Sequence, residues 1–141
     1  MLIDANLLLY AVDRTSPFHQ VASGWLTDQF NGPRRVGLPW QSLVAFLRIS
    51  TNPRAYTSPL TVDEAMGILD DWLALDVVWT PTPGSQHNQL LTGLVRRHQL
   101  QGNMISDAHL AALALEHGLT LCSADTDFAR FPELGWVNPL R

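Results

Sequence analysis

The stretch Met1-Leu2-Ile3-Asp4-Ala5-Asn6-Leu7-Leu8 places one aspartate between two apolar runs. The residues before Asp4 have the length and composition of a short buried strand, and residues 6–12 continue as a helix. In open parallel sheets, functional groups gather where the strands end. An acid directly after a buried strand therefore predicts an α/β fold with its chemistry at the carboxyl edge of the sheet.

Along the rest of the chain, short apolar runs alternate with amphipathic stretches of helical length. The expected strands span residues 1–3, 36–38, 77–79, 119–123 and 136–137. The expected helices span residues 6–12, 18–30, 40–49, 61–73, 86–99 and 107–117. Nearly strict alternation of this kind predicts a mostly parallel sheet of about four or five strands.

Local signals define the ends of several expected helices. Thr61 and Glu64 have the spacing of a capping box, in which each side chain serves a free backbone N–H of the other residue. Ser106 is placed to cap a helix that begins at Asp107, and Gly118 is placed to end that helix in the left-handed conformation.

The composition limits the classes of function that the chain can have. Its 141 residues and 46% hydrophobic content predict one domain with a sizeable core. Only 16% of the residues are charged, against about 25% in an average soluble protein, which leaves room for an apolar surface that a partner covers. The net charge of −4 excludes binding of nucleic acid by bulk positive charge. All nine basic residues are arginines, which excludes mechanisms that need a lysine.

The single cysteine and the absence of long apolar runs restrict the environment of the protein. Cys122 lies in an apolar run and is interpreted as a buried strand thiol, so a disulfide within the chain and a cysteine-rich zinc site are excluded. No apolar run reaches the ~18 residues of a membrane span. Met1 leads directly into an apolar strand without a basic signal sequence, so we expect a soluble, cytoplasmic protein with no membrane partner.

Four aspartates lie where an α/β fold places its functional site: Asp4, Asp107, Asp125 and Asp127. Plainer interpretations exist, because Asp107 could complement a helix dipole and Asp125 or Asp127 could cap a short helix at Phe128. Carboxylates that converge at one sheet edge repel one another and need a cation. An all-oxygen set favours Mg²⁺ or Mn²⁺ over Zn²⁺, and such an ion suits the hydrolysis of phosphodiesters.

A second feature is an acid-free stretch between Asp28 and Asp63 with a local charge of +4. Its basic residues are Arg34, Arg35, Arg48 and Arg54. This stretch could contact phosphate groups, or it could be an ordinary solvated face or a surface for an acidic partner. The five histidines are interpreted as surface or packing residues, with His109 the one possible neighbour of the site because it stands two residues after Asp107.

Three acidic segments, residues 2–8, 102–111 and 122–128, together resemble the PIN domain family. The closest resemblance is to VapC-type toxins of type II toxin–antitoxin systems, and residues 40–48 and 131–140 resemble one subgroup of these toxins. The resemblance implies a single PIN domain over residues 1–141 with a three-layer α/β/α fold. It also implies a Mg²⁺-dependent endoribonuclease that cuts structured RNA such as tRNA, rRNA or mRNA. The implied partners are a second copy of the chain, in a homodimer, and a VapB-type antitoxin.

By position, the resemblance assigns Asp4 and Asp107 as the principal metal ligands, Asp125 as the third acid and Asp127 as an additional acid. The sequence departs from the family pattern in the segment 40–48, where many PIN domains carry a further acid, usually a glutamate. Ala45 stands at about that position, and Gln41 or Ser42 can offer only neutral oxygens. The departure puts the binding of a second metal ion in question.

Two other functions remain open at the level of sequence. A PIN-like module could bind RNA or an antitoxin without cleaving, which the missing helix acid favours. A phosphatase of the haloacid-dehalogenase type also has an aspartate after its first strand, but Asn6 stands where a second acid is expected, and the chain contains no lysine.

Overall fold

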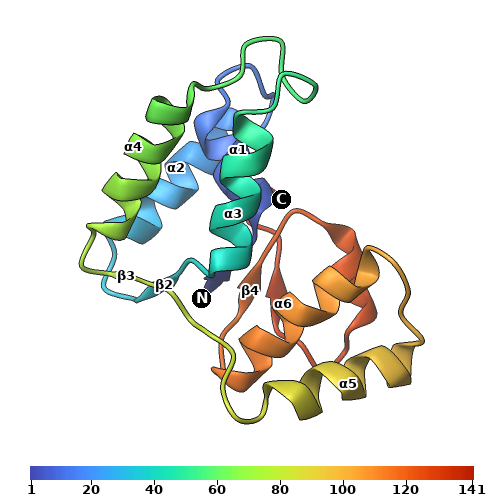
Figure 1. Cartoon of the computed structure of the whole chain (residues 1–141). Coiled ribbons are helices and arrows are strands. Elements are labelled where there is room, and N and C mark those ends of the chain that lie inside the picture. The colour runs from blue at the N-terminus through green and yellow to red at the C-terminus, as the bar shows by residue number, and fades with distance from the viewer.

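The computed structural model describes residues 1–141 and has a fully parallel five-stranded sheet at its centre. The order across the sheet is β3-β2-β1-β4-β5, so the first strand of the chain lies in the middle (Figure 1). The strands are β1 (Leu2–Ile3), β2 (Val36–Gly37), β3 (Val78–Trp79), β4 (Leu121–Cys122) and β5 (Trp136–Val137). All five expected strands are present; four of them are shortened to two residues, and β5 has the expected bounds.

Six α-helices and one short 3₁₀ helix connect these strands. The helices are α1 (Ala5–Val12), α2 (His19–Phe30), α3 (Trp40–Ser50), α4 (Val62–Leu73), α5 (His87–His98), α6 (Met104–Glu116) and the 3₁₀ helix η1 (Thr126–Arg130). Figure 1 shows α1 to α4 gathered on one side of the molecule and α5 and α6 on the other. None of these helices is long and apolar enough to cross a bilayer.

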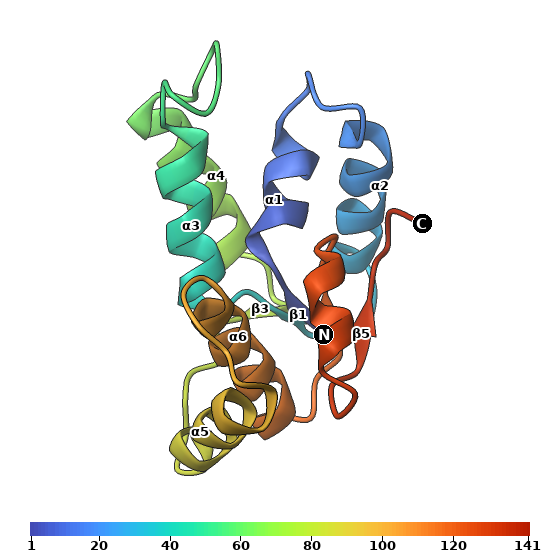
Figure 2. The same cartoon turned by 90° about the vertical axis from the view of Figure 1, so that its right-hand side faces the viewer.

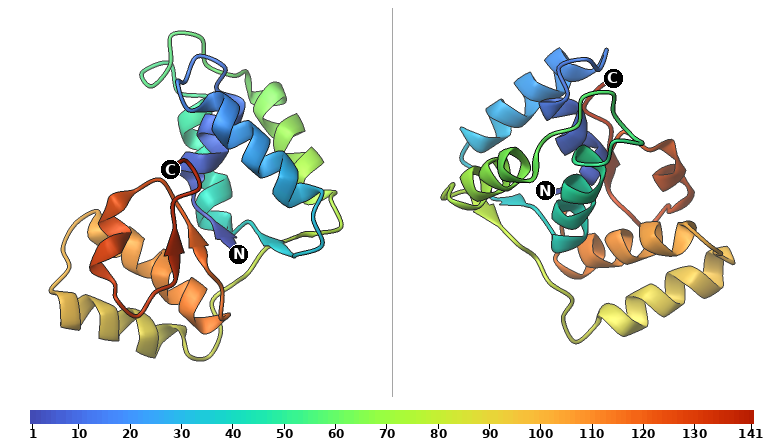
Figure 3. Two further views of the ribbon diagram at one scale, coloured as in Figure 1. Left: turned by 180° about the vertical axis from the view of Figure 1, so that it is seen from behind. Right: turned by 45° about the horizontal axis from the view of Figure 1, so that its top comes forward.

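Each face of the sheet has its own hydrophobic core, because successive strand residues point to opposite faces. Leu2 and Leu121 belong to a core that α5, α6 and η1 cover. Ile3 and Cys122 belong to a second core that α1 to α4 cover. The rotated views in Figures 2 and 3 show these helical layers from further directions. The expected three-layer α/β/α arrangement is therefore confirmed.

Several of the predicted helix ends are confirmed. The side chain of Thr61 accepts a hydrogen bond from the backbone N–H of Glu64 at 3.1 Å, and the Glu64 carboxylate accepts one from the N–H of Thr61 at 2.9 Å, which completes the capping box. Gly118 has a φ of +64°, a left-handed conformation that glycine adopts without steric cost. Cys122 is buried in β4, and burial raises the pKa of its thiol to about 11.

The prediction that Ser106 caps the helix carrying Asp107 is wrong. Helix α6 begins three residues before the predicted start, at Met104, and its N-cap residue, Asn103, makes no side-chain capping bond. Gly102, with a φ of +60°, turns the chain instead, and its carbonyl accepts a hydrogen bond from the N–H of Ile105. A backbone turn thus replaces the side-chain cap, and Asp107 remains in the first turn of α6.

Substitution of α3 residues that pack in the α1–α4 core should destabilise the protein more than substitution of exposed α3 residues. Phe46 is fully buried and its ring centroid lies 4.8 Å from that of Trp72. We expect Phe46→Ala to lower the free energy of unfolding by about 3–5 kcal/mol, because it removes buried surface and leaves a cavity. Urea denaturation followed by circular dichroism measures this change.

The matched control lies on the same helix. Val44 is 54% exposed, so Val44→Ala should change the free energy of unfolding by less than about 0.5 kcal/mol. Equal losses in the two variants would contradict this assignment of the core.

Candidate metal centre

The candidate site lies at the carboxyl edge of the two central strands. Leu2 pairs with Leu121 and Ile3 pairs with Cys122, so Asp4 and Ser123 are the next residues on the two strands. The backbone N–H of Asp4 donates to the carbonyl of Cys122 at 3.0 Å, which extends the pairing to the site itself. Asp4 is also the N-cap of α1, and its Oδ1 accepts a hydrogen bond from the N–H of Ala5 at 2.8 Å.

The buried hydroxyl of Ser123 connects the acids at this edge. It donates to Oδ2 of Asp4 at 2.7 Å and accepts from the side-chain amide of Asn6 at 3.1 Å. It also accepts from the backbone N–H of Asp125 at 3.0 Å. Ser123 is fully buried, so these contacts satisfy its hydrogen-bonding capacity in place of water. The sequence analysis missed Ser123 and Asn6, although polar residues at the ends of buried strands are a signal that could have indicated them.

Asp125 has both a structural and a site position. Its carboxylate caps η1 by accepting the backbone N–H of Asp127 at 2.9 Å, which confirms the interpretation of an acid capping a short helix at Phe128. The same turn brings Asp127 toward α6. Capping and a role in the site are therefore compatible for this residue.

Three carboxylates converge between α6 and η1. One oxygen each from Asp107, Asp125 and Asp127 lies within 4.8 Å of the others. Asp4 stands beside this group, near enough to Asp125 and Asp107 for their charges to interact, but its oxygens are held by Ser123, Asn6 and Ala5. The structure thus brings all four predicted acids to the carboxyl edge of the sheet. Asp4 is held there by its hydrogen bonds.

Burial and repulsion between neighbouring charges raise the pKa values of two of these acids, Asp107 and Asp4. Burial, followed by the charges of Asp125, Asp4 and Asp127, raises the pKa of Asp107 to about 6. Burial also raises the pKa of Asp4, against the opposing hydrogen bonds from Ser123 and Ala5. Crowded carboxylates with raised pKa values are stabilised by a positive charge between them.

The donor set fits a hard divalent cation. It consists of carboxylate oxygens, which are the ligands that Mg²⁺ and Mn²⁺ prefer, and the converging groups include no thiol or imidazole. Helix α3 adds no acid to the set. Ser42 donates its hydroxyl to the carbonyl of Ile3 at 2.7 Å, and Gln41 donates its amide to the carbonyl of Ser106 at 3.1 Å. Ala45 lines a groove between α3 and Ser106, the residue before Asp107.

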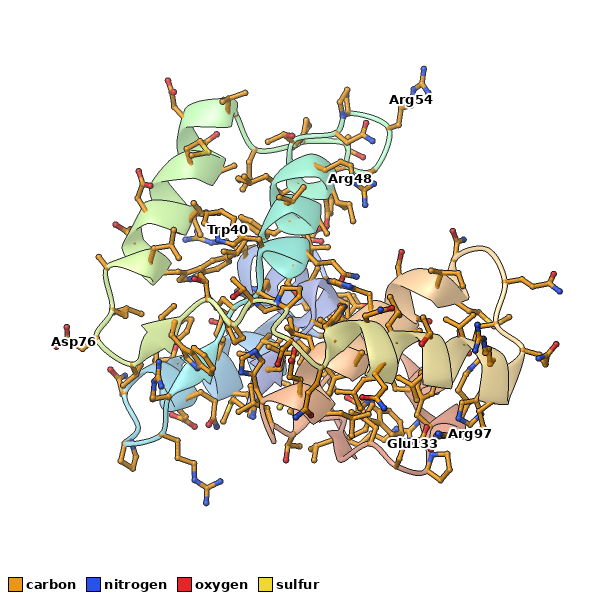
Figure 4. All side chains as sticks on the ribbon, turned by 60° about the horizontal axis from the view of Figure 1, so that its bottom comes forward. Trp40, Arg48, Arg54, Asp76, Arg97 and Glu133 are labelled. Atoms are coloured by element: carbon orange, nitrogen blue, oxygen red, sulfur yellow. The ribbon has the colours of Figure 1, made fainter.

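The four arginines of the basic stretch do not form one face. Arg34 and Arg35 directly precede β2, at the amino edge of the parallel sheet and opposite to the acids. The guanidinium of Arg35 lies 4.1 Å from the ring centroid of Trp79. Arg48 lies on α3 and Arg54 in the loop after it (Figure 4). The four arginines are close in sequence, which suggested a common surface. Strand β2 separates Arg34 and Arg35 from Arg48 and Arg54, so the two pairs lie at different edges of the sheet.

Two other side chains, on the elements that carry the acids, differ in their surroundings. The Nδ1 of His109 lies 3.0 Å from the Nε2 of His87, so the two rings join α6 to α5. Arg130, which the sequence analysis did not single out, lies at the end of η1 and its charge lowers the pKa of Asp107. Its importance could not be read from the sequence, because it depends on where η1 sits relative to α6.

The fold and the acidic edge agree with a comparison to known families. Residues 1–134 match the family model described as PIN domain. The chain belongs to the PIN domain family, as the resemblance of its acidic segments indicated.

Similar proteins cover the whole chain. Ribonuclease VapC33 of Mycobacterium tuberculosis is 39% identical over 138 residues, which is 98% of this chain and 96% of that protein. VapC ribonuclease Mb2897 of Mycobacterium bovis is 37% identical over 140 residues, which is 99% of this chain and 95% of that protein.

Solved structures share the fold at lower sequence identity. VapBC2 from Rickettsia felis, bound to a DNA fragment from its promoter, has a TM-score of 0.68 at 17% identity and covers 97% of this chain and 96% of that one. VapC20 of Mycobacterium tuberculosis, described as a sarcin–ricin loop cleaving toxin, has a TM-score of 0.66 at 16% identity, with 93% and 94% covered.

A divalent cation should stabilise the protein more at about pH 7.5 than at about pH 5. The folded-state pKa of Asp107, about 6, is above its ordinary value of 3.8. The contribution of this carboxyl to stability is therefore present below the ordinary pKa and is lost as the pH rises through about 6. Above that pH the ionised acids repel one another, and a bound cation relieves the repulsion. Thermal unfolding with and without Mn²⁺ at both pH values measures the difference.

The control for this experiment is Asp107→Asn. It should raise the melting temperature of the metal-free protein at the higher pH and remove most of the gain from Mn²⁺. A gain that is equal at both pH values in the wild-type protein would contradict this account of the site.

Proposed function

We propose that the protein is a metal-dependent endoribonuclease of the VapC kind. The observation that carries this proposal is the convergence of Asp107, Asp125 and Asp127 beside Asp4, in a chain that is 39% identical over nearly its whole length to a ribonuclease. A site made of carboxylates alone supplies metal ligands and little other chemistry. Hydrolysis of a phosphodiester needs few further protein groups.

In this proposal, Asp4, Asp107 and Asp125 hold Mg²⁺, or Mn²⁺ in its place, and Asp127 assists at the exposed side. When bound, the ion lowers the pKa of water and neutralises charge on the reacting phosphate. Asp4 keeps a fixed orientation because Ser123 and the N–H of Ala5 hold its two oxygens. The side chain of Asp127 is 58% exposed, so it faces the direction from which RNA arrives.

The proposed substrates are structured RNAs such as tRNA or rRNA. The net charge of −4 makes a broad electrostatic attraction to RNA impossible, so binding depends on a few local contacts. Arg48 and Arg54 lie on or after α3, the helix that starts beside the site, whereas Arg34 and Arg35 lie at the far edge of the sheet. The first pair is therefore the better candidate for contact with RNA phosphates.

The proposed partners are a VapB-type antitoxin and a second copy of the chain. The solved structures with this fold include VapBC and FitAB complexes, which supports a cognate antitoxin as partner. In this proposal, the antitoxin inhibits by covering the acidic edge. Exposed Trp40, Val44, Met104 and Ile105 give the chain apolar surface near that edge, which a partner would cover.

The alternative function is a PIN module that binds RNA or an antitoxin without cleaving. The specific observation in its favour is the absence of an acid on α3, where Ala45 lines the groove beside Ser106. Both functions predict the same partners. Only a cleavage measurement distinguishes them.

Asp4→Asn should reduce cleavage of bulk tRNA by on the order of 10²–10³-fold, because it removes a charge at the centre while keeping the size of the side chain. The purified chain, free of antitoxin, is incubated with total RNA and with bulk tRNA in Mg²⁺, in Mn²⁺ and in EDTA. We expect discrete fragments with either metal and none in EDTA. Circular dichroism establishes that the variant is folded.

A matched control is Asp76→Asn, which removes one exposed carboxylate at the outer edge of the molecule (Figure 4). This variant should cleave as fast as the wild type. Full cleavage by folded Asp4→Asn would refute the assignment of Asp4. Absence of cleavage by the folded wild-type chain in every metal would instead favour the binding module.

A further inference from the structure

Arg130 lies at the acidic edge, although no part of the proposed mechanism uses it. Its Nε donates to the backbone carbonyl of Asp127 at 3.0 Å, and its Nη2 lies 3.5 Å from a carboxylate oxygen of the same residue. Its Nη1 contacts the sulfur of Met104. Met104 begins α6 and Asp107 follows one turn later on the same face, so the guanidinium lies across the start of the helix that carries Asp107.

The contacts of Arg130 do not exhaust its hydrogen-bonding groups. A guanidinium has five N–H donors in a fixed plane. The contacts to Asp127 and Met104 engage three of them at most, because each of the three nitrogens makes one contact. The side chain is 30% exposed, so the remaining donors are accessible to a ligand from outside.

Structural stability does not explain this placement well. The ion pair with Asp127 spans one turn of η1 at 3.5 Å, and the carboxylate is 58% exposed. Exposed pairs of this kind add little to the stability of a fold. The position beside four acids has a clearer electrostatic consequence, since Arg130 is the one cation whose charge lowers the pKa of Asp107.

An RNA phosphate that approaches this edge meets four aspartates of its own sign. A guanidinium at the rim offsets that repulsion, and its planar donors match the oxygens of a phosphodiester. Arg34 and Arg35 cannot serve in this way, because they lie at the amino edge of the sheet, opposite to the acids.

We propose that Arg130 binds an RNA phosphate next to the acidic centre and so positions the backbone of the substrate for cleavage. The proposal rests on the ribonuclease function proposed above. Met104 and the Asp127 carbonyl hold the guanidinium in place, and its free N–H groups contact the phosphate.

The test measures RNA binding separately from cleavage. Fluorescently end-labelled bulk tRNA is titrated with the full chain in the cleavage-deficient Asp4→Asn background, in Mn²⁺, at several salt concentrations. Adding Arg130→Gln should raise Kd by roughly tenfold, the expected loss for one charge-assisted contact. The slope of log Kd against log salt should fall by roughly 0.7, the change for one phosphate contact with single-stranded RNA.

The control is Arg97→Gln, which makes the same chemical change at a side chain that is 60% exposed and paired with Glu133 at 3.1 Å. Figure 4 shows Arg97 beside Glu133, at the opposite end of the view from Arg48 and Arg54. This variant should leave both Kd and the salt slope unchanged. An equal effect of Arg97→Gln and Arg130→Gln would overturn the proposal, because it would show only the loss of general positive charge.

Cleavage by variants with an intact Asp4 supplies the second readout. Arg130→Gln should lower kcat/KM on bulk tRNA by roughly 10²-fold, and Arg130→Lys, which keeps the charge, should recover part of the loss. Calorimetric titration with Mn²⁺ should give an unchanged or higher metal affinity in Arg130→Gln. A lower metal affinity with unchanged tRNA binding would overturn the proposal, since Arg130 would then act only by orienting Asp127.

Different results would contradict the ribonuclease function and the role of Arg130. If the wild-type chain does not cleave, the ribonuclease function is contradicted, and the tRNA titrations still report on Arg130 as an RNA contact. If the wild type cleaves RNA, and Arg130→Gln binds and cleaves it equally well, only the inference about Arg130 is wrong and the ribonuclease function stands.

Discussion

The parallel pairing of β1 with β4 is the constraint on which the acidic edge depends. Its register sets Leu2 beside Leu121 and Ile3 beside Cys122, so Asp4 and Ser123 leave the two strands together and meet through one hydrogen bond. A shift of one residue would turn every side chain of a strand to the other face. Leu2 and Ile3 fill different cores, and packing on both sides of the sheet therefore enforces the geometry of the site.

Much of the fold could be predicted because its signals are local. An aspartate after an apolar run, a threonine three residues before a glutamate, and a glycine after a helix each act on their immediate neighbours. Asp4, Thr61 and Gly118 accordingly have the predicted structural positions. The convergence of acids from distant segments followed from topology, since parallel strands share a carboxyl edge.

The features that escaped prediction depend on contacts between distant segments. Arg130 is 26 residues from Met104, and only the packing of η1 against α6 brings them together. The arginines from 34 to 54 are close in sequence, but the chain crosses the sheet between them, so they lie at different edges. The start of α6 was misplaced because the turn at Gly102 leaves no capping side chain to recognise.

The position of β1 in the middle of the sheet also has a consequence for synthesis of the protein. The strands on one side of β1, β2 and β3, precede residue 80, whereas the strands on its other side, β4 and β5, follow residue 120. Chains emerge from the ribosome with the N-terminal part first. The helices α1 to α4 can therefore cover one face of β1 first, and the other face stays uncovered until α5, α6 and η1 have been translated. Asp107, Asp125 and Asp127 emerge late, so a nascent chain has no acidic centre until nearly all of it has been translated.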